Sequence, residues 1–500
     1  MYSKEPMVTP MQQIHIGLGR EGYVPVSRHQ ADKATYTQEH EALQASLVNS
    51  CPAHLWPKNS HKAACPRPIL MTKQHQTQLA ELHEALTAAI TDIVERWWTD
   101  KESRFPERMP LTSKEEGLLQ WLDDQVSRGT LPRYSKCRGG WRPDFMIEDP
   151  CEQGTGIESF RITEINARFS FNGFMHQAYG QLALDDMGVK AHGLVAATSA
   201  ARALDGLFDL FRVDVPLHLL KGEEKGMDIH MMMHDLQRRF GFRPRLITPA
   251  DLRLLPDPEN SSRRKLYCVV RTNGHDGSCA LKTHHGEVVE EIFQLGLELH
   301  QRELLALEPE MLRQVCLLGF NDMRTLLLVH DKRMLGIVRQ ELGPLVAKKV
   351  LTQAQAEVLD KGIAKTILAG SAELRQLLVK SQSFPKLRHQ YILKPIRGGK
   401  GAGILFGDSI SIDTWIDTLE RMRTAGLGSE ASYVVQRRIT PRLYEMVLDS
   451  SGDRVQYPLV GTYHAVHGKL VGLGIWRTSG DRICAISTGG SWLCSVLRAD

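Results

Sequence analysis

Apolar residues recur every three or four positions along residues 72–98, in the segment TKQHQTQLAELHEALTAAITDIVERWW. This spacing is the period of an amphipathic helix, because it gathers the apolar side chains on one face. The positions that set the pattern are Leu79, Leu82, Leu86, Ile90 and Ile93. We therefore predict an N-terminal helical region over residues 71–135. Residues 1–70 are rich in His, Pro, Gln and Ser, and for them we expect an irregular lead-in.

Two short apolar runs, DFMIED and FRITEINARFSF, flank the turn sequence PCEQGTG. This arrangement predicts a β-hairpin within residues 136–190. Side chains alternate between the two faces of a strand, so Glu164 and Asn166 point to the same side. Asp144 lies on the other arm of the hairpin and is expected to meet them, with Arg142 on the same face.

Strand and helix signals alternate over residues 191–324, in VPLHLL, MDIHMMMHDLQRRFG and KLYCVVR. Such alternation favours an α/β lobe with a partly parallel sheet, which we expect to be the substrate-binding domain. Residues 325–500 mix helices with the strand signals SYVVQRR, YPLVGTYHAV and KLVGLGIWRTS. We expect an α+β domain with an antiparallel sheet there.

Length and charge limit the classes of function. A chain of 500 residues exceeds one ordinary domain of about 100 to 200 residues, so several lobes are expected. The net charge of +4 is small for this length, and it gives no argument for a nucleic-acid or membrane partner. No run of about 18 apolar residues occurs, and the N-terminus lacks the apolar core of a signal peptide. We expect a cytoplasmic protein.

The cysteines indicate reduced thiols. There are nine of them, scattered without a common spacing, which does not suit a disulfide framework. Four potential zinc ligands, Cys51, His54, His61 and Cys65, gather in CPAHLWPKNSHKAAC. Their spacing matches no standard zinc module, so an ordinary loop is favoured over a metal site.

A glycine-rich loop follows an apolar strand in YILKPIRGGKGAGILFG, residues 391–407. A P-loop requires a glycine where Lys394 stands and Ser or Thr where Gly401 stands, and the spacing of a dinucleotide fingerprint is also absent. A strand, a loop and a second strand remain, with Lys394 projecting from the first. Glycines let backbone N–H groups approach a polyphosphate, so this pattern suits a flap over ATP. The alternative is a flexible hairpin turn.

Oxygen ligands converge on the predicted hairpin. Two carboxylates and one amide, from Asp144, Glu164 and Asn166, supply the hard oxygen donors that Mg²⁺ prefers. A solvated acidic face is the alternative. Lys332, in VHDKRMLGIV, stands at the start of a predicted helix, where an ammonium is unfavourable unless an anion is also present. A surface lysine is the alternative for this residue.

Six segments, taken in chain order, resemble motifs of the ATP-grasp superfamily, in the branch of glutathionylspermidine synthase and eukaryotic glutathione synthetase. They are RPDF, ITEINARFSFNG, VHDKR, YILKPIRGGKGAG, SYVVQRRI and PLVGTYHAVHGKLVGLGIWRTS. In most ATP-grasp enzymes the lysines precede the Glu-x-Asn strand. Here TEIN comes first, which is the permuted order of this branch.

The resemblance implies an α+β ATP-grasp fold with antiparallel sheets around an ATP cleft, an inserted α/β substrate-binding domain and a helical N-terminal region. It also implies a carboxylate–amine ligase that forms an amide through an acyl phosphate and releases ADP and phosphate. The expected cofactors are ATP and Mg²⁺. The expected partners are amino-acid-like carboxylate and amine substrates, and a second copy of the chain in a homodimer.

The same resemblance assigns roles to residues of this sequence. ATP is expected to contact Lys332, Lys394, Gly398, Gly399, Lys400, Gly401, Gln436, Arg437, Arg438 and Ile439. The metal ligands are expected to be Asp144, Glu164 and Asn166. The expected catalytic residues are Arg142, Arg477 and Arg397, of which Arg142 and Arg477 would hold the carboxylate and the acyl phosphate.

This sequence departs from the family pattern at three places. The loop offers Gly398, Gly399 and Lys400 where relatives have Arg-Glu-Gly with a second metal ligand. Arg437 stands where glutathione synthetase has a glutamate, and Ser479 where it has a lysine. These departures motivate one alternative, an ATP-binding regulatory or scaffolding protein with impaired catalysis. A third possibility is a kinase-like enzyme that stops at phosphorylation.

Overall fold

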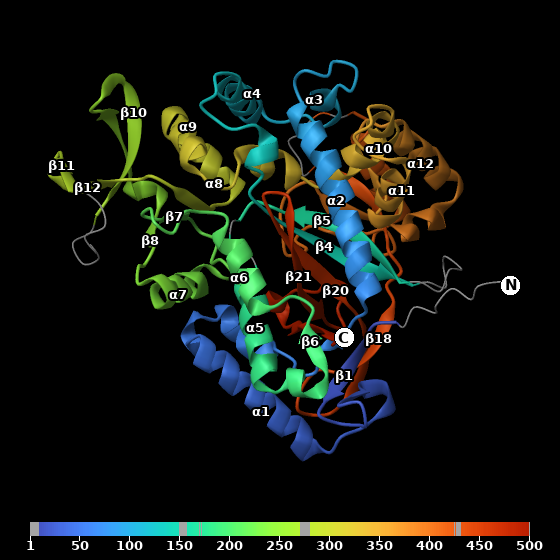
Figure 1. Ribbon diagram of the computed structural model, residues 1–500. Coiled ribbons are helices and arrows are strands. Elements are labelled where there is room, and N and C mark those ends of the chain that lie inside the picture. Colours follow the sequence, from blue (N-terminus) through green and yellow to red (C-terminus); the bar gives the residue numbers. More distant parts are fainter. Residues whose placement is uncertain are drawn as a thin grey trace.

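The computed structural model describes residues 10–149, 158–169, 171, 173–270, 281–424, 426 and 432–499. The turn expected at residues 150–156 lies outside this part of the chain. Helices and several separate sheets alternate through the molecule (Figure 1), so the mixed α and β class expected from the sequence is confirmed.

Residues 10–70 contain regular elements, contrary to the irregular lead-in expected for residues 1–70. β1 (Gln12–Ile16) pairs with β2 (Tyr23–Pro25) and with β3 (Ile69–Leu70), and α1 (Lys33–Ser50) lies between them in sequence. The buried face of α1 includes Tyr36 and His40 beside leucines. Because polar and aromatic residues form part of that face, the composition of this segment did not indicate a helix.

The terminal strands meet in one five-stranded sheet of order β2-β1-β3-β23-β6. β23 (Ser495–Arg498) runs parallel to β3 and antiparallel to β6 (Leu194–Ala196). Residues 194–196 were expected in the α/β lobe, but the hydrogen bonds to β23 place them with the two chain ends instead. The segment after α1 continues in short 3₁₀ helices, Ala53–Leu55 and Pro57–Ala63.

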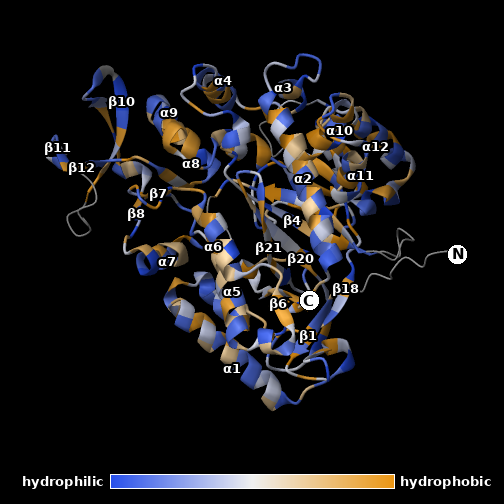
Figure 2. Cartoon of the chain, viewed as in Figure 1, coloured by the Kyte–Doolittle hydropathy of each residue, from blue (hydrophilic) through white to orange (hydrophobic). Residues whose placement is uncertain are grey.

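The helical region expected after residue 70 consists of α2 (Lys73–Glu95), α3 (Phe105–Arg108) and α4 (Ser113–Ser127). α2 begins with a capping box in which the Thr72 side chain accepts from the N–H of His75, which satisfies a donor left free at a helix start. Apolar and polar residues alternate along α2 (Figure 2), and its apolar face packs into the main core.

The predicted hairpin is the pair β4 (Gly140–Glu148) and β5 (Ser159–Asn166). It forms one edge of an antiparallel sheet of order β22-β21-β20-β4-β5, with β20 (Val460–Val466), β21 (Lys469–Thr478) and β22 (Ser491–Leu493). An early hairpin is therefore completed by strands from the C-terminal part of the chain. This central sheet carries Arg142, Asp144, Glu164, Asn166 and Arg477, five of the residues predicted to act.

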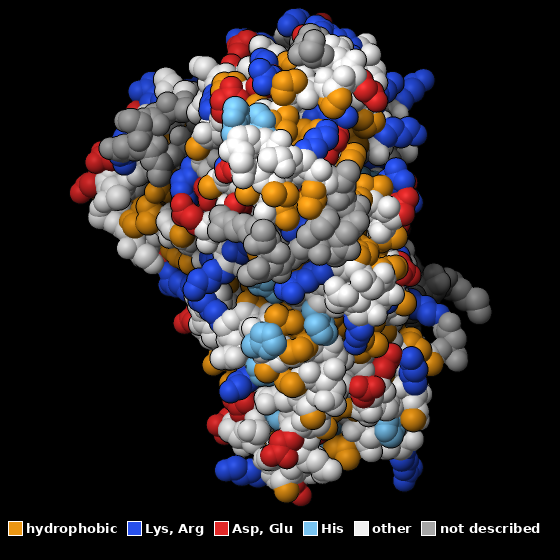
Figure 3. Space-filling view, turned by 90° about the vertical axis from the view of Figure 1, so that its left-hand side faces the viewer, with side chains coloured by type: hydrophobic (Ala, Val, Ile, Leu, Met, Phe, Trp, Pro, Cys, Tyr) orange, Lys and Arg blue, Asp and Glu red, His pale blue; other side chains and the backbone are white. Residues whose placement is uncertain are grey.

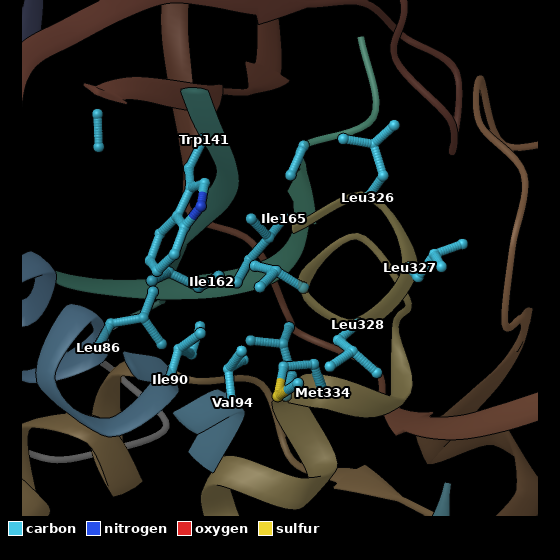
Figure 4. Close-up of a cluster of buried hydrophobic side chains, with 14 of the residues drawn as sticks. Leu86, Ile90, Val94, Trp141, Ile162, Ile165, Leu326, Leu327, Leu328 and Met334 are labelled. Atoms are coloured by element: carbon cyan, nitrogen blue, oxygen red, sulfur yellow. The ribbon is translucent and has the colours of Figure 1, made fainter. Parts of the chain in front are cut away.

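Apolar side chains hold the hairpin against the helices (Figure 4). Trp141, Ile162 and Ile165 project from the sheet toward Leu86, Ile90 and Val94 of α2 and Met334 of α10 (Arg333–Ala347). Leu326, Leu327 and Leu328 come from a π-helical turn, Thr325–Val329. Each fully buried side chain of this size contributes about 1.5–3 kcal/mol, so the cluster fixes the position of the hairpin.

The α/β lobe is built on a parallel sheet of order β13-β7-β8, as the alternation predicted. Its strands are β7 (His218–Lys221), β8 (Arg245–Ile247) and β13 (Leu295–Glu298), with α7 (Ile229–Phe240) between the first two in sequence. β9 (Leu252–Asp257), β10 (Asn260–Val269), β11 (Leu281–His284) and β12 (Glu287–Glu291) form an antiparallel sheet that projects from the molecule (Figure 1). α8 (Gln301–Ala306) and α9 (Pro309–Leu318) follow.

The C-terminal part contains the second sheet of the site, of order β14-β17-β15-β16 with every pairing antiparallel. Its strands are β14 (Thr366–Ile367), β15 (Tyr391–Pro395), β16 (Leu405–Phe406) and β17 (Tyr433–Arg437). α12 (Ala372–Ser383) and α13 (Ile412–Arg421) pack their apolar residues against it.

The remaining C-terminal elements lie outside this sheet. α10 (Arg333–Ala347) and α11 (Gln353–Gly362) lie beside α2 (Figure 1). β18 (Leu443–Val447) pairs with β19 (Arg454–Pro458).

Two further features agree with the sequence. On the face shown in Figure 3, Lys and Arg side chains are interspersed with Asp and Glu, in keeping with a net charge of +4. Within the described residues, none of the helices combines the length and apolarity that crossing a membrane requires.

Candidate active site

One cavity of about 1010 Å³ gathers nearly all the residues predicted to act. Its walls come from the central sheet, the β14–β17 sheet, the glycine loop and the α/β lobe. The predicted residues that line it are Arg142, Asp144, Glu164, Asn166, Lys394, Arg397, Gly398, Gly399, Lys400, Gly401, Gln436, Arg437, Arg438, Ile439 and Arg477. Lys332 lies beside the wall, where its Nζ donates to the carbonyl of Gly398 at 2.8 Å.

The strand register places the acidic residues as direct neighbours. Asp144 stands opposite Glu164, and Arg142 stands opposite Asn166, with an irregularity in the pairing just after Asp144. Like charges directly opposite each other on a sheet are destabilising unless nearby cations offset them. The pair of carboxylates therefore requires positive charge around it.

Four cationic side chains supply that charge. Arg477 Nη2 donates to Asp144 Oδ2 at 2.7 Å, and Arg142 Nε lies 3.3 Å from Oδ1 of the same carboxylate. Lys332 Nζ lies 3.5 Å from Glu164 Oε2. The buried ammonium of Lys394 donates to the carbonyl oxygen of Thr163 at 3.3 Å.

These charges control the ionisation of the pair. Burial opposes ionisation of Glu164, but the ammonium groups of Lys332 and Lys394 outweigh it and hold the pKa of Glu164 at about 2. Burial lowers the pKa of Lys394, and the nearby Glu164 carboxylate counteracts that shift. Glu164 is consequently a carboxylate at every physiological pH.

The donor set fits a hard divalent cation. Oδ1 of Asp144 is buried and accepts no hydrogen bond from the described residues, while Oδ2 is held by Arg477. Glu164 and Asn166 line the same cavity from adjacent positions of one strand face. Two carboxylates and an amide oxygen are the ligands that Mg²⁺ prefers, and the cavity leaves room for phosphate oxygens and water.

One end of the cavity is lined by apolar side chains, those of Met146, Ile392, Phe406, Ile439, Pro441 and Val460. Ile392 and Phe406 are direct cross-strand partners on β15 and β16, and Met146 and Val460 on β4 and β20. The Gln436 amide donates to Thr163 O at 3.1 Å and to Thr366 Oγ1 at 3.0 Å, so its side chain braces β17.

The glycine loop borders the cavity between β15 and β16. Gly398 and Gly401 have φ of 110° and 74°, which glycine adopts without strain. A Cβ at Gly401 would lie 2.4 Å from Ile483 Cγ2, so a side chain at that position would displace its neighbour. At the tip, Lys400 Nζ reaches across to Glu224 Oε1 of the α/β lobe at 2.8 Å.

Arg397 lines the cavity and is also held by two buried acids. Its Nη1 and Nη2 lie 2.9 Å and 3.0 Å from the carboxylate of Glu115 on α4, and its Nε lies 3.4 Å from Asp331. These contacts tie the base of the glycine loop to the N-terminal helices. The catalytic role of Arg397 stays a prediction.

The other end of the cavity holds charged residues that sequence reasoning missed. They are Arg168, Glu224, Glu298 and His300. Glu298 is the last residue of β13, and ligands commonly bind at the carboxyl ends of parallel strands. An acidic residue closing the apolar run QLGLEL was the available signal. Arg168 could have been found from its place two residues after Asn166.

His330 and Cys484 also line the cavity. Burial, together with the charges of Arg168 and Lys332, lowers the pKa of His330 to about 3, so the imidazole is neutral. Burial raises the pKa of the Cys484 thiol, which disfavours the nucleophilic thiolate. Neither group has the properties of a base or nucleophile at neutral pH.

The cysteines and the proposed zinc ligands stand apart from this chemistry. The seven cysteines in the described part of the chain are free thiols. Within the described residues, one group of three potential metal ligands has its ligand atoms within 4.8 Å of one another. It consists of His218, Cys268 and Glu290. This group does not include Cys51, His54, His61 or Cys65.

Comparisons with known proteins agree with this geometry. The sequence profile of a family described as the AnkG N-terminal domain matches residues 82–328. The "ATP-grasp enzyme ankG" of Aspergillus thermomutatus is 36% identical over 430 residues, which cover 84% of this chain and 86% of that protein. A solved structure of a glutathione synthetase-like effector from Globodera pallida matches with a TM-score of 0.50 over 93% of this chain and 98% of the other. At 11% identity that match shows a shared fold.

Proposed function

Because this chain belongs to the ATP-grasp enzymes, as a relative of AnkG, and is therefore an ATP-dependent ligase, we propose that it joins a carboxylate to an amine through an acyl phosphate. The products would be an amide, ADP and phosphate. The observation that carries the proposal is the meeting, in one cavity, of the acidic hairpin and the lysine-bearing strand β15.

The nucleotide would lie along the wall formed by the β14–β17 sheet. Its base would lie against the apolar lining residues that include Phe406 and Val460, beside residues 437–439. Lys394 and Lys332 would neutralise phosphate oxygens, because their ammonium groups lie at the junction of this wall with the hairpin. The glycine loop would cover the phosphates and exclude water from a hydrolysable intermediate.

Asp144, Glu164 and Asn166 would hold Mg²⁺, which when bound neutralises phosphate charge and orients the transferred group. Relatives provide a further ligand from a glutamate in the flap, whereas Gly399 and Lys400 occupy that place here. The ammonium of Lys400 is instead paired with Glu224. We propose that one metal ion and the lysines carry the phosphate charge.

The reacting carboxylate would bind at the two buried guanidinium groups. Arg142 and Arg477 flank Asp144 and line the cavity next to the hairpin. Burial lowers the pKa of Arg142, which still remains charged at neutral pH. Because the charge that develops during phosphoryl transfer lies on oxygens, fixed cations at this place stabilise the transition state.

In this mechanism the carboxylate oxygen attacks the γ-phosphorus, and ADP leaves. The amine nitrogen then attacks the acyl carbon, and the bond from that carbon to the phosphate oxygen breaks. The protein's residues position the reactants and offset charge, and no side chain becomes covalently modified. This assignment agrees with the absence of an ionised thiol among the described cavity residues.

The test is a screen of the purified chain with ATP, Mg²⁺ and a panel of amino-acid-like carboxylates and amines. Carboxylate-dependent ADP release, together with an amide detected by mass spectrometry, is the expected result. Phosphorylation without amide would instead favour a kinase-like enzyme, and binding of ATP without turnover on any pair would contradict ligase activity.

A further inference from the structure

We propose that Glu298 receives the amine substrate, a primary amine carried as its ammonium form, and accepts the proton that must leave before the nitrogen attacks. This inference rests on the proposed ligase function and deepens it. It assigns a substrate class and a catalytic residue to the end of the cavity formed by the α/β lobe.

Glu298 is buried and still reaches the cavity. Its exposed fraction is 0%, yet it lines the cavity wall. Oε1 accepts a hydrogen bond from the backbone N–H of Phe171 at 3.1 Å, whereas Oε2 accepts none from the described residues. A buried carboxyl oxygen without a donor is costly, and an ammonium from the cavity would supply one.

Gly226 stands beside Oε2 at the cavity wall. It has φ of 74°, and a Cβ at this position would lie 3.7 Å from Oε2 and 2.9 Å from Ile229 Cγ2. Glycine therefore lets the backbone pass close to Glu298, and both residues border the space that a ligand would fill. Met227 adds apolar surface to the same wall, which suits the carbon chain of an alkylamine.

Both acids and cations lie near Glu298. They are Lys221 and Glu224 of the β7 end, Asp228 at the start of α7, Arg168 after β5, and His300 and Arg302 around the start of α8, while Glu224 is itself paired with Lys400. Asp228 holds His176 through Nδ1 at 2.8 Å and the N–H of Met175 at 2.7 Å. On Glu298 itself, the charges of Asp228 and Glu224 each act more strongly than that of Lys221. At this carboxyl a cation is therefore favoured over an anion.

The protonation properties of Glu298 suit proton transfer from an amine. Burial, reinforced by the charges of Asp228 and Glu224, raises the pKa of Glu298 to about 8. An ordinary carboxylate is too weak a base to take a proton from an alkylammonium. A carboxylate with a pKa near the working pH is far better matched to that task.

The steps balance as follows. At neutral pH Glu298 holds a proton, and binding of the ammonium favours its ionised form, so that this proton passes to solvent as the amine binds. The ammonium then transfers one of its own protons to the Glu298 carboxylate, which becomes a neutral acid again, and the nitrogen regains its lone pair. That pair forms the C–N bond, while the C–O bond to phosphate breaks and the phosphate leaves with its electrons. The second proton lost from nitrogen goes to the departing phosphate. Glu298 keeps its proton until the next amine binds.

The experiment compares two amines in the wild type and in E298Q, using a carboxylate that supports ADP release. Hydroxylamine is uncharged at neutral pH and traps acyl phosphates as hydroxamates without needing a base. Ethylamine and ethylenediamine are ammonium ions and require one. We expect E298Q to lower amide formation with these alkylamines by about 10² to 10⁴, and to leave the hydroxamate rate within a few-fold of wild type.

The pH dependence provides the second readout. The deficit of E298Q should shrink toward high pH, where alkylamines are already neutral in solution. The exposed Glu259, in the same lobe, supplies the matched control E259Q, which should behave as wild type. Circular dichroism and thermal melting verify that each variant is folded.

The outcomes separate the inference from the function on which it rests. Equal losses with hydroxylamine and alkylamines, or no loss with either, would overturn the role of Glu298 while leaving the ligase intact. Failure of the wild type to form hydroxamate with any carboxylate would overturn the ligase assignment, and the inference with it.

Discussion

Arg477 Nη2 and Asp144 Oδ2 lie 2.7 Å apart, although they are 333 positions apart in the chain. This contact exists because β21 and β4 flank β20 in the central sheet. It fixes a guanidinium beside the acidic hairpin, where the proposed acyl phosphate would form. The first prediction concerns this pair.

Substitution R477K should reduce carboxylate-dependent ADP release by about 10²-fold, because lysine keeps the charge but cannot present a planar fork to an oxyanion. The KM for the carboxylate should rise together with the loss in kcat. Steady-state kinetics measure both. R128K, at an exposed arginine on the end of α4, is the matched control. A wild-type KM for the carboxylate in R477K would remove Arg477 from the proposed site.

Substitution D144N should destabilise the fold as well as the activity. Asp144 is 5% exposed and is the shared partner of Arg142 and Arg477. Removing one member of a buried ionic group costs about 3–5 kcal/mol, because the remaining charges lose their compensation. Chemical denaturation should therefore show a clear loss of unfolding free energy. An unchanged denaturation curve would contradict the buried ionic arrangement.

Substitution E164Q should raise the Mg²⁺ concentration needed for half-maximal ADP release by about tenfold or more, since an ionised carboxylate is a preferred Mg²⁺ ligand. With a pKa of about 2, Glu164 remains ionised throughout a titration near neutral pH. Protonation of Glu164 should therefore not raise the Mg²⁺ concentration that the wild type needs when the pH is lowered moderately below neutral. E148Q on the same hairpin, outside the cavity, is the control. An E164Q titration that overlays wild type would exclude Glu164 from the metal site.

The ion pair between Lys400 and Glu224 should have a small effect on closure of the glycine loop. Lys400 is 56% exposed, and exposed pairs contribute about 0–1 kcal/mol. K400A and E224Q should each raise amine-independent ATP hydrolysis by a few-fold, as water reaches the intermediate more often. A double-mutant cycle measures the coupling between them. Strictly additive effects would show that the pair has no role in closure.

The stability of the protein should depend on Glu298 in a pH-dependent way. Its pKa is raised from 4.5 to about 8, so the folded chain holds a proton that the unfolded chain releases in this interval. The stabilisation from the neutral carboxyl is full below pH 4.5 and is lost as pH rises through about 8, at up to about 1.4 kcal/mol per pH unit. Relative to E298Q, the wild type should lose thermal stability between about pH 5 and pH 8. Parallel melting curves across this interval would contradict the raised pKa.

The sequence alone predicted which site residues share a strand face or a hairpin. It did not predict which distant strands pair to form the site. The period of two along a strand placed Glu164 and Asn166 on one face, and the hairpin brought Asp144 opposite Glu164. The same local patterns could not indicate that β20 would pair with β4, because pairing between distant strands depends on the whole fold. Composition failed for α1, whose buried face includes Tyr36 and His40.

The contacts of single site residues could not be predicted either. The partner of Arg397, Glu115, is on a helix with no recognised motif. Glu298 was missed because a single acidic residue after a short strand is common. Its significance depends on burial and on the cavity that only the folded lobe creates.

The most direct test of the account is calorimetric binding of a non-hydrolysable ATP analogue in the presence of Mg²⁺. The central claim is that the early acidic hairpin and the late lysine-bearing strand hold the two sides of one triphosphate. E164Q and K394M should therefore each weaken binding by about tenfold or more, while K386M, at an exposed lysine before β15, should bind as wild type does. Undiminished binding in both E164Q and K394M would contradict the claim.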